Sequence, residues 1–214
     1  MELGYWNIKG RVEPIRLLLA YTKQEYKDVH PTSKEDWAEK RSKLGFESPN
    51  LPYLIDGDFS LTESSAILYY VAERSGDQSL IGKDIKQRAR IQMVGGMLND
   101  ISIGILGFRT KEDKVKGFKE VFTTKPGILL SNLDKMAENN DFVLGELTYV
   151  DFALSALFEA ITTFSSFLGV DNPLLQYKNL VASQKRFVEL PGVKEYLASD
   201  ASKRPFLPPS SFQK

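Results

Sequence analysis

The first connection in the chain carries more chemically capable side chains than a simple turn needs. It lies in the stretch LGYWNIKGRVEPIR, where Leu3 to Trp6 has the pattern of a strand and a helix begins near Glu13. Between these elements stand Tyr5, Trp6 and Arg11, which supply a phenolic hydroxyl, an indole and a guanidinium. A tyrosine hydroxyl at the end of a strand can donate its hydrogen to a bound anion, and a thiolate is one such anion.

Two kinds of sequence pattern divide the chain. Up to about residue 80 the patterns predict the order βαβ, a polar helix, then ββα. The segments that predict these elements are, in order, ELGYW, EPIRLLLAYT, EYKDVH, SKEDWAEKRSK, YLI, FSL and the run after LTESS. The Asp56-Gly57-Asp58 turn predicts a hairpin. From about Asp84 onward only helical periods remain. We therefore expect an α/β domain over residues 1–80 and an all-helical domain over residues 84–214.

Composition excludes several classes of site and partner. Lysine plus arginine equal aspartate plus glutamate at 28 each, so no net field steers the chain toward nucleic acid or an anionic membrane. With no cysteine and a single histidine, His30, a typical zinc site is not expected, and His30 is expected to be an ordinary solvated residue. The start of the chain lacks a signal-peptide pattern, which favours a cytoplasmic location.

The most apolar stretch, Phe152 to Leu168, is interpreted as a buried helix. It is slightly short for a membrane span and has Glu159 near its middle. Its start, LTYVDF, predicts a capping box in which Thr148 and Asp151 satisfy each other's backbone N–H groups. Asp151 is therefore expected to be a structural residue.

A proline at the start of the third strand gives the first domain a recognisable layout. Proline cannot donate to a sheet ladder and is confined to strand starts, edges and bulges. A βαβ–ββα unit with proline at this point is the thioredoxin layout, in which Pro52 is either cis or an ordinary trans strand-start proline. Enzymes of that layout often carry Cys-x-x-Cys after the first strand, where this chain has Tyr5-Trp6-Asn7-Ile8. A thiol used here must therefore arrive with a ligand.

At this level of detail the chain resembles a cytosolic glutathione S-transferase and is most similar to the mu class. The resemblance covers essentially the whole chain and rests on the motifs LGYWNIKG, PIRLLLAY, KLGFESPNLPYLIDGD, LTESSAIL and GELTYVDF. It implies an α/β thioredoxin-like N-terminal domain followed by an all-α C-terminal helical bundle that forms the electrophile pocket. It further implies a homodimer that uses glutathione as co-substrate, without a metal. The reaction implied is attack of the glutathione thiolate on electrophilic, mostly hydrophobic small molecules.

The resemblance also implies roles for individual residues. Tyr5 matches the tyrosine that stabilises the thiolate. Arg11 departs from the mu pattern and is expected either to assist the thiolate, as in alpha-class members, or to pair with Glu13 at the surface. Trp6, Trp37 and Arg41 match positions that contact the glycyl end of the tripeptide.

Five further positions match the segment that holds the rest of glutathione. Asn50 and Leu51 match a backbone-pairing segment, and Pro52 matches the cis proline of the family. Glu63 and Ser64 match the residues that bind the γ-glutamyl end. Ser64 opens a helix, and a helix N-terminus offers free N–H groups to a carboxylate.

Two positions in the helical half complete the expected site. Asp100 matches an aspartate that reaches the amino group of glutathione in the partner subunit. Phe108 is the best candidate for an aromatic residue that lines the electrophile pocket. The glycines at 95, 96, 104 and 107 predict either close approach of a partner helix or ligand, or a locally broken helix.

The thiolate chemistry is within the capacity of one hydroxyl. Lowering a thiol pKa from about 8.5 by roughly 2 units needs about 2.7 kcal/mol of preferential stabilisation of the thiolate. A hydrogen bond to a charged group supplies roughly 1.5–3 kcal/mol. Two other functions remain open: a non-catalytic carrier of hydrophobic ligands, and a glutathione-dependent isomerase or peroxidase on the same scaffold.

Overall fold

The computed structural model describes residues 1–207, and the chain divides into two compact units. The first unit combines Met1–Gly76 with the chain from Leu190 onward, and the second unit is Asp77–Glu189. Residues 190–207 were expected to belong with the helical half, but they group with the α/β half. The expected boundaries at residues 80 and 84 stay predictions.

The first unit is built on a four-stranded mixed sheet, as a thioredoxin-like fold requires. Strand order is β2-β1-β3-β4, with β1 parallel to β2 and antiparallel to β3, and with β3 antiparallel to β4. The strands are β1 (Glu2–Gly4), β2 (Lys27–Val29), β3 (Tyr53–Asp56) and β4 (Phe59–Thr62). A two-residue turn joins β3 to β4, and Gly57 in that turn has φ +65°, a conformation that favours glycine.

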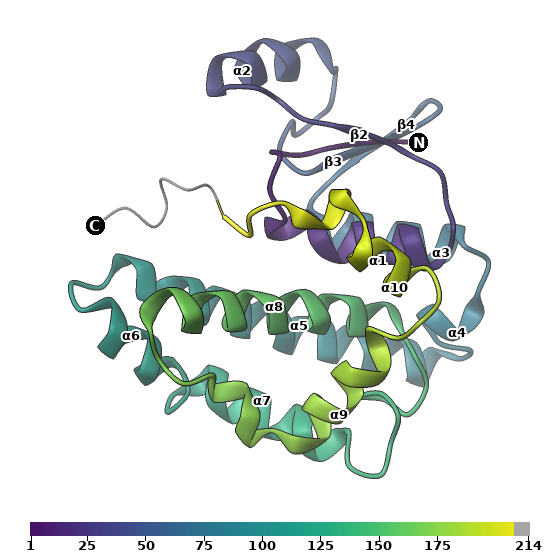
Figure 1. Ribbon diagram of the computed structural model, residues 1–214. Helices are drawn as coiled ribbons and strands as arrows, with labels where there is room; N and C mark the ends of the chain where they lie inside the picture. The colour runs from purple at the N-terminus through teal and green to yellow at the C-terminus, as the bar shows by residue number, and fades with distance from the viewer. Residues whose placement is uncertain (208–214) are drawn as a thin grey trace. The chain divides into compact units, whose positions relative to one another are not determined.

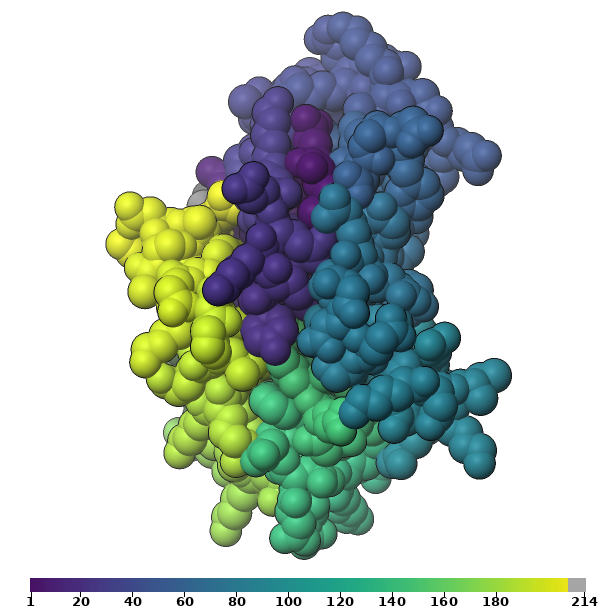
Figure 2. All heavy atoms as spheres, turned by 90° about the vertical axis from the view of Figure 1, so that its right-hand side faces the viewer, coloured from purple at the N-terminus to yellow at the C-terminus, as the bar shows by residue number. Residues whose placement is uncertain are grey.

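Helices cover both faces of this sheet. Figure 1 shows α1 (Glu13–Tyr21) and α3 (Ser64–Arg74) on one side and α2 (Lys34–Lys43) on the other. Helix α1 begins with Pro14 in its first turn, where a missing N–H costs nothing, and buries Ile15, Leu17, Leu18 and Leu19. Helix α10 (Val193–Ala198) packs against α1, and Figure 2 shows this C-terminal part of the chain, in yellow, beside the purple residues of α1. Helix α10 is thus part of the first unit.

The second unit is helical, apart from two isolated bridges at 142–146, as the sequence predicts. Its helices are α4 (Gln78–Ile81), α5 (Ile85–Gly107), α6 (Lys114–Val121), α7 (Lys125–Met136), α8 (Tyr149–Leu168) and α9 (Lys178–Phe187). On α8, one stripe of apolar residues is buried, namely Leu154, Leu157, Phe158 and Ile161, whereas Leu168 is only half-buried. Short 3-10 turns complete the chain at η1 (Gly10–Val12), η2 (Phe108–Thr110), η3 (Pro173–Gln176) and η4 (Asp200–Lys203).

Two stretches of the second unit are long and apolar enough to span a membrane by length and composition alone. They are Ile85–Thr110 and Tyr149–Leu168, and their most apolar windows are 33% and 67% buried within the structure. Burial of most of the second window fits the interpretation of α8 as a core helix. One or two such helices are weak grounds for a membrane protein.

The glycine-rich helix α5 is not broken. It runs without interruption from Ile85 to Gly107, so the broken-helix alternative is wrong. At Gly104 an added Cβ would lie 2.4 Å from the Pro126 ring of α7, whereas at Gly95 it would meet Val150 at an ordinary 3.7 Å. Close approach of α7 therefore explains Gly104.

We predict opposite effects of alanine at these two glycines. Gly95→Ala should raise the free energy of unfolding by about 0.5–1 kcal/mol, because alanine favours helix and the added methyl has room. Gly104→Ala should lower it by about 1–3 kcal/mol, because overpacking against Pro126 outweighs the gain in helix propensity. Urea unfolding of both variants measures this, and a stabilised Gly104→Ala would contradict the packing explanation.

The predicted capping box at the start of α8 forms. The Asp151 carboxylate accepts hydrogen bonds from the backbone N–H and the hydroxyl of Thr148, at 2.8 and 3.0 Å. It also accepts from the N–H of Val143 at 3.4 Å. Burial nevertheless raises the pKa of Asp151 from 3.8 to about 6.

This raised pKa predicts a pH dependence of stability. Because folded Asp151 holds its proton more tightly than unfolded Asp151, the stabilising contribution is present below about pH 4 and is lost as pH rises through about 6. Relative to Asp151→Asn, the wild type should lose about 3 kcal/mol of unfolding free energy between pH 4 and 7. Urea unfolding across that range tests it, with Asp113→Asn at the exposed N-cap of α6 as control. Equal pH slopes in wild type and Asp151→Asn would refute the prediction.

Candidate active site

The predicted binding residues of the first unit meet at one end of its sheet. One row of paired residues crosses that end, because Gly4 pairs with Val29 and Tyr53, and Tyr53 pairs with Thr62. Tyr5 and Trp6 follow the row on β1, residues 50–52 precede it on β3, and residues 63–64 follow it on β4. Strand register therefore gathers segments that are far apart in sequence.

Tyr5 stands at the end of this row with its hydroxyl against the next turn of the chain. Its side chain is buried, and the hydroxyl oxygen accepts a hydrogen bond from the backbone N–H of Arg11 at 3.4 Å. A Cβ at Gly10 would lie 3.0 Å from that oxygen, and Gly10 has φ +46°. With the oxygen facing a donor, the hydroxyl hydrogen is available for a bound acceptor.

The surroundings of Arg11 exclude one of its two expected roles, the surface ion pair with Glu13. Its side chain is exposed on η1, whereas Glu13 is fully buried, lies 3.8 Å from Arg16 and accepts from the Tyr196 hydroxyl at 3.1 Å. A surface ion pair between Arg11 and Glu13 is therefore wrong. Assistance of a thiolate by Arg11 stays a prediction.

The segment before β3 is organised around Asn50. The Leu51–Pro52 bond is cis, as the resemblance implies. The Asn50 side chain accepts from the Leu51 N–H at 2.9 Å and donates to the Glu63 carboxylate at 3.3 Å. Asn50, Leu51 and Glu63 are thus brought together, and a peptide that pairs with the Leu51 N–H has to displace the Asn50 oxygen.

Helix α3 presents an uncapped N-terminus at the same end of the sheet. Glu63 occupies the N-cap position with φ +71°, a conformation uncommon outside glycine, and no side chain caps the first turn. Ser64 is the first residue of the helix. The free N–H groups and partial positive charge of a helix N-terminus suit a carboxylate ligand.

Trp37 and Arg41 lie one turn apart on the exposed helix α2. The Trp37 ring stacks on Tyr53 with 6.1 Å between centroids and 12° between planes, and Phe46 meets Tyr53 edge-on at 5.7 Å. Burial, with a hydrogen bond to Glu2, raises the pKa of Tyr53, so its hydroxyl stays protonated. Trp37 thus joins α2 to the sheet, while Arg41 is exposed.

The two predicted residues of the second unit have different surroundings. Asp100 is exposed on α5 and forms an ion pair with Lys125 at 2.6 Å. Phe108 is only 3% exposed, and its ring packs edge-on against Phe118 and Phe164 at 5.1 and 5.3 Å. This core position weighs against Phe108 as a pocket-lining residue, and we do not assign it that role.

Sequence reasoning missed a polar network beside Tyr5. Arg16 is fully buried and binds both oxygens of Asp28 at 3.1 and 3.2 Å, while Arg204 binds Asp28 at 2.5 Å. His30 is not an ordinary solvated residue, because its Nδ1 lies 3.0 Å from the Tyr5 carbonyl oxygen. The Asp28 carboxylate also acts on Tyr26, whose pKa is raised to about 12 mainly by burial and further by Asp28. The available signal was an arginine inside the apolar run PIRLLLA.

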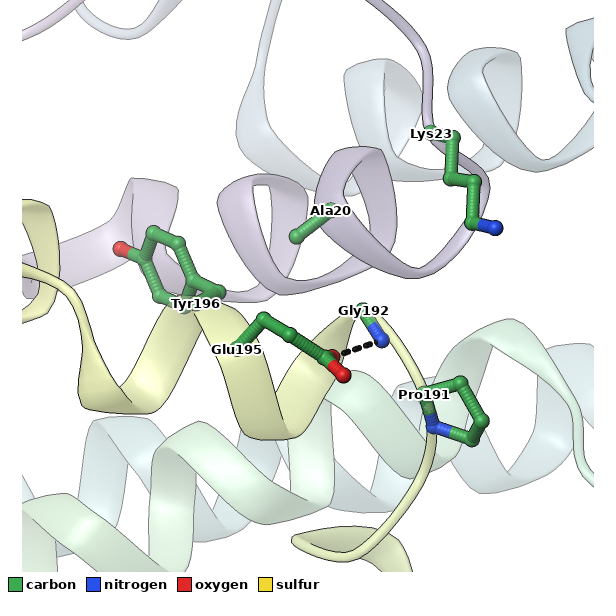
Figure 3. Close-up of a pocket in the computed structure, with 6 residues that line it drawn as sticks. All are labelled: Ala20, Lys23, Pro191, Gly192, Glu195 and Tyr196. Carbon is green, nitrogen blue, oxygen red and sulfur yellow. Dashed lines mark hydrogen bonds between the residues drawn. The ribbon is translucent and has the colours of Figure 1, made fainter.

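A separate open depression lies where α10 meets the end of α1. It has a volume of about 570 Å³ and is lined by Ala20, Lys23, Pro191, Gly192, Glu195 and Tyr196 (Figure 3). The Glu195 carboxylate caps its own helix by accepting from the Gly192 N–H. None of the predicted glutathione residues lines this depression. Within residues 1–207, no group of three or more histidine, aspartate or glutamate side chains is placed to hold a metal ion.

Comparison with known proteins gives one family for both units. Residues 1–73 match the glutathione S-transferase N-terminal domain, and residues 99–200 match the glutathione S-transferase C-terminal domain. A glutathione S-transferase class-mu 26 kDa isozyme of Schistosoma mansoni is 35% identical over 203 residues, covering 92% of this chain and 88% of its own length. Glutathione S-transferase 2 of Gallus gallus is 32% identical over 206 residues, covering 93% and 90%.

Solved structures agree with the sequence relatives. The glutathione S-transferase Blo t 8 superposes with a TM-score of 0.80 at 30% identity, over 98% of this chain and 97% of its own. Prostaglandin synthase D of Nilaparvata lugens, at 23% identity, shares the fold with a TM-score of 0.76, over 97% and 98%. The chain therefore belongs to the glutathione S-transferase family, uses glutathione as its co-substrate, and is similar to class-mu members.

Proposed function

We propose that this glutathione S-transferase activates its co-substrate through the hydroxyl of Tyr5. The observation that carries the proposal is the hydrogen bond from the Arg11 N–H to the Tyr5 oxygen, which leaves the hydroxyl hydrogen for the sulfur. Donation of that hydrogen stabilises the thiolate relative to the thiol, and more thiolate means faster attack on an electrophile. The Arg11 side chain adds positive charge near the same place.

The remaining groups of glutathione find complementary partners at the same end of the sheet. The uncapped N-terminus of α3 at Ser64 suits the γ-glutamyl carboxylate, and the Glu63 carboxylate suits the neighbouring ammonium. Residues 50–52 offer backbone groups to the extended tripeptide. Arg41, with Trp6 and Trp37, suits the glycyl carboxylate. Orientation of the tripeptide then supplies the proximity that the reaction needs.

The second substrate is a hydrophobic electrophile, and the enzyme acts in the cytoplasm. A carrier of hydrophobic ligands without catalysis is the main alternative, and a glutathione-dependent isomerase or peroxidase is another. The presence of Tyr5 favours catalysis. A panel of electrophiles assayed with and without glutathione separates these functions, because a carrier binds glutathione without turnover of any of them.

We further propose a homodimer in which α5 faces its partner. An exposed stripe of mainly apolar residues runs along one face of this helix, with Asp100 among them: Ile85, Ala89, Met93, Gly96, Asp100 and Ile103. Apolar residues at these spacings on an exposed helix are typical of a protein interface. A second copy of the chain covers the stripe, which brings Asp100 toward the partner's glutathione.

We predict that Tyr5→Phe retains glutathione and loses thiolate. Removal of one charge-assisted hydrogen bond should raise the thiol pKa in the complex by about one unit or more, which lowers kcat/KM about tenfold at pH values below both thiol pKa values. Ultraviolet absorbance of the thiolate during a pH titration measures the pKa. The variant to compare is Arg11→Leu, which keeps the backbone N–H but removes the guanidinium, and it should raise the thiol pKa less than Tyr5→Phe does. A shift in Arg11→Leu without one in Tyr5→Phe would transfer the role to Arg11.

We predict that Asp100→Asn weakens glutathione binding by about tenfold, whereas Lys125→Ala does not. Both variants break the same exposed ion pair, which contributes little to stability. Only Asp100→Asn removes a charge that meets the ammonium of glutathione in the partner, and a charged hydrogen bond lost there costs about 1.5 kcal/mol. Calorimetry measures the affinity and sedimentation the dimer. Equal affinities in the two variants, or a wild-type monomer with full affinity, would refute the shared site.

A further inference from the structure

The C-terminal residues of the first unit are bonded directly to the loop that carries Tyr5. We call residues 5–12 the thiol loop and residues 204–206 the strap. The N–H of Lys9 donates to the carbonyl of Pro205 at 2.9 Å, and the N–H of Gly10 donates to the carbonyl of Phe206 at 3.0 Å. Two consecutive amides of the thiol loop are therefore held by residues almost 200 positions later in the chain.

The strap is fixed at its start by a shielded ion pair. Arg204 donates to the Asp28 carboxylate at 2.5 Å, and the two side chains are 17% and 16% exposed. The same carboxylate accepts two hydrogen bonds from the buried Arg16. A charge-assisted bond in such a setting is stronger and better ordered than an exposed surface pair.

Asp28 also connects the strap to the far side of the thiol loop. Nη1 of Arg16 donates to the carbonyl of Ile8 at 2.7 Å in a buried contact. The ring of His30 donates from Nδ1 to the Tyr5 carbonyl, and its Nε2 lies 3.7 Å from Asp28. Arg16, His30 and Arg204 therefore all contact the Asp28 carboxylate. Arg16 and His30 also bond directly to carbonyl groups of the thiol loop, whereas Arg204 begins the strap that bonds to its amides.

Small displacements of the thiol loop would change the orientation of the Tyr5 hydroxyl. Gly10 lies against that hydroxyl, and the next residue, Arg11, supplies the N–H that its oxygen accepts. The strap binds the two amides immediately before this N–H. If residues 9 and 10 shift, the bond between Arg11 and Tyr5 lengthens and the hydroxyl loses its orientation. Errors of about 1 Å in the position of a reacting group are costly for catalysis.

We propose that the strap, anchored by Arg204 on Asp28, is a positioning element for the thiolate. It acts by holding the thiol loop so that the Tyr5 hydroxyl faces the sulfur. The inference rests on the proposed role of Tyr5. It assigns to residues 204–206 a function in glutathione activation.

Two truncations of the full chain separate the strap from the residues beyond it. A chain ending at Leu207 keeps the strap, and a chain ending at Lys203 lacks it. Relative to the longer chain, the shorter one should show a glutathione thiol pKa raised by about half a unit or more, which is a roughly threefold or greater loss of thiolate at pH values below both thiol pKa values. The loss should appear in kcat more than in the glutathione dissociation constant, because removal of the strap leaves residues 50–52 and 63–64 unchanged.

Point variants of Arg204 test the role of the strap even if the shorter chain does not fold. Arg204→Gln removes the charge that anchors the strap, and Arg204→Lys keeps it. Arg204→Gln should raise the thiol pKa and speed hydrogen exchange at the Lys9 and Gly10 amides, and Arg204→Lys should restore much of both. An unchanged thiol pKa in folded Arg204→Gln overturns the strap proposal. If Tyr5→Phe also leaves the thiol pKa unchanged, the proposed role of Tyr5 fails as well, so the two failures are distinguishable.

Discussion

A buried guanidinium is the constraint around which the α/β unit is arranged. Arg16 is fully buried on α1, and an unpaired charge in that position would be strongly destabilising. The chain satisfies it with Asp28 from β2, the Ile8 carbonyl from the thiol loop and nearby Glu13 from its own helix. One side chain therefore fixes the relation between the first helix, an edge strand and the loop that carries Tyr5. The chemistry depends on that loop, so the fold and the reaction share this interaction.

The pairing register of the strands positions the remaining groups of the site. The pairing of Gly4 with Tyr53 requires glycine, because a Cβ at Gly4 would lie 2.0 Å from the Tyr53 ring. That ring also supports Trp37, so one aromatic residue links β1, β3 and the exposed helix α2. A short sheet thus brings a hydroxyl, a peptide-pairing segment and an uncapped helix N-terminus to one end. These are the groups that an activated thiol on a charged tripeptide needs.

Local patterns in the sequence predicted the elements well, because each depends on neighbours in the chain. The four strands of the first unit, the turn at Gly57 and the Thr148–Asp151 capping box are such local features, and the structure contains all of them. What the sequence did not predict depends on contacts between distant segments. The roles of His30 and Arg204, the burial of Phe108, and the return of residues after 190 to the first unit are examples. The residue-by-residue match to the family named the expected binding positions, but it could not show which of them already contact one another.

A crystal structure with glutathione bound tests the central claim most directly. The account predicts that the sulfur lies within hydrogen-bond distance of the Tyr5 hydroxyl, while the Arg11 N–H still faces the tyrosine oxygen and the Lys9 and Gly10 amides still pair with the strap. A sulfur atom turned away from Tyr5, toward the Arg11 guanidinium or a serine hydroxyl, would contradict it.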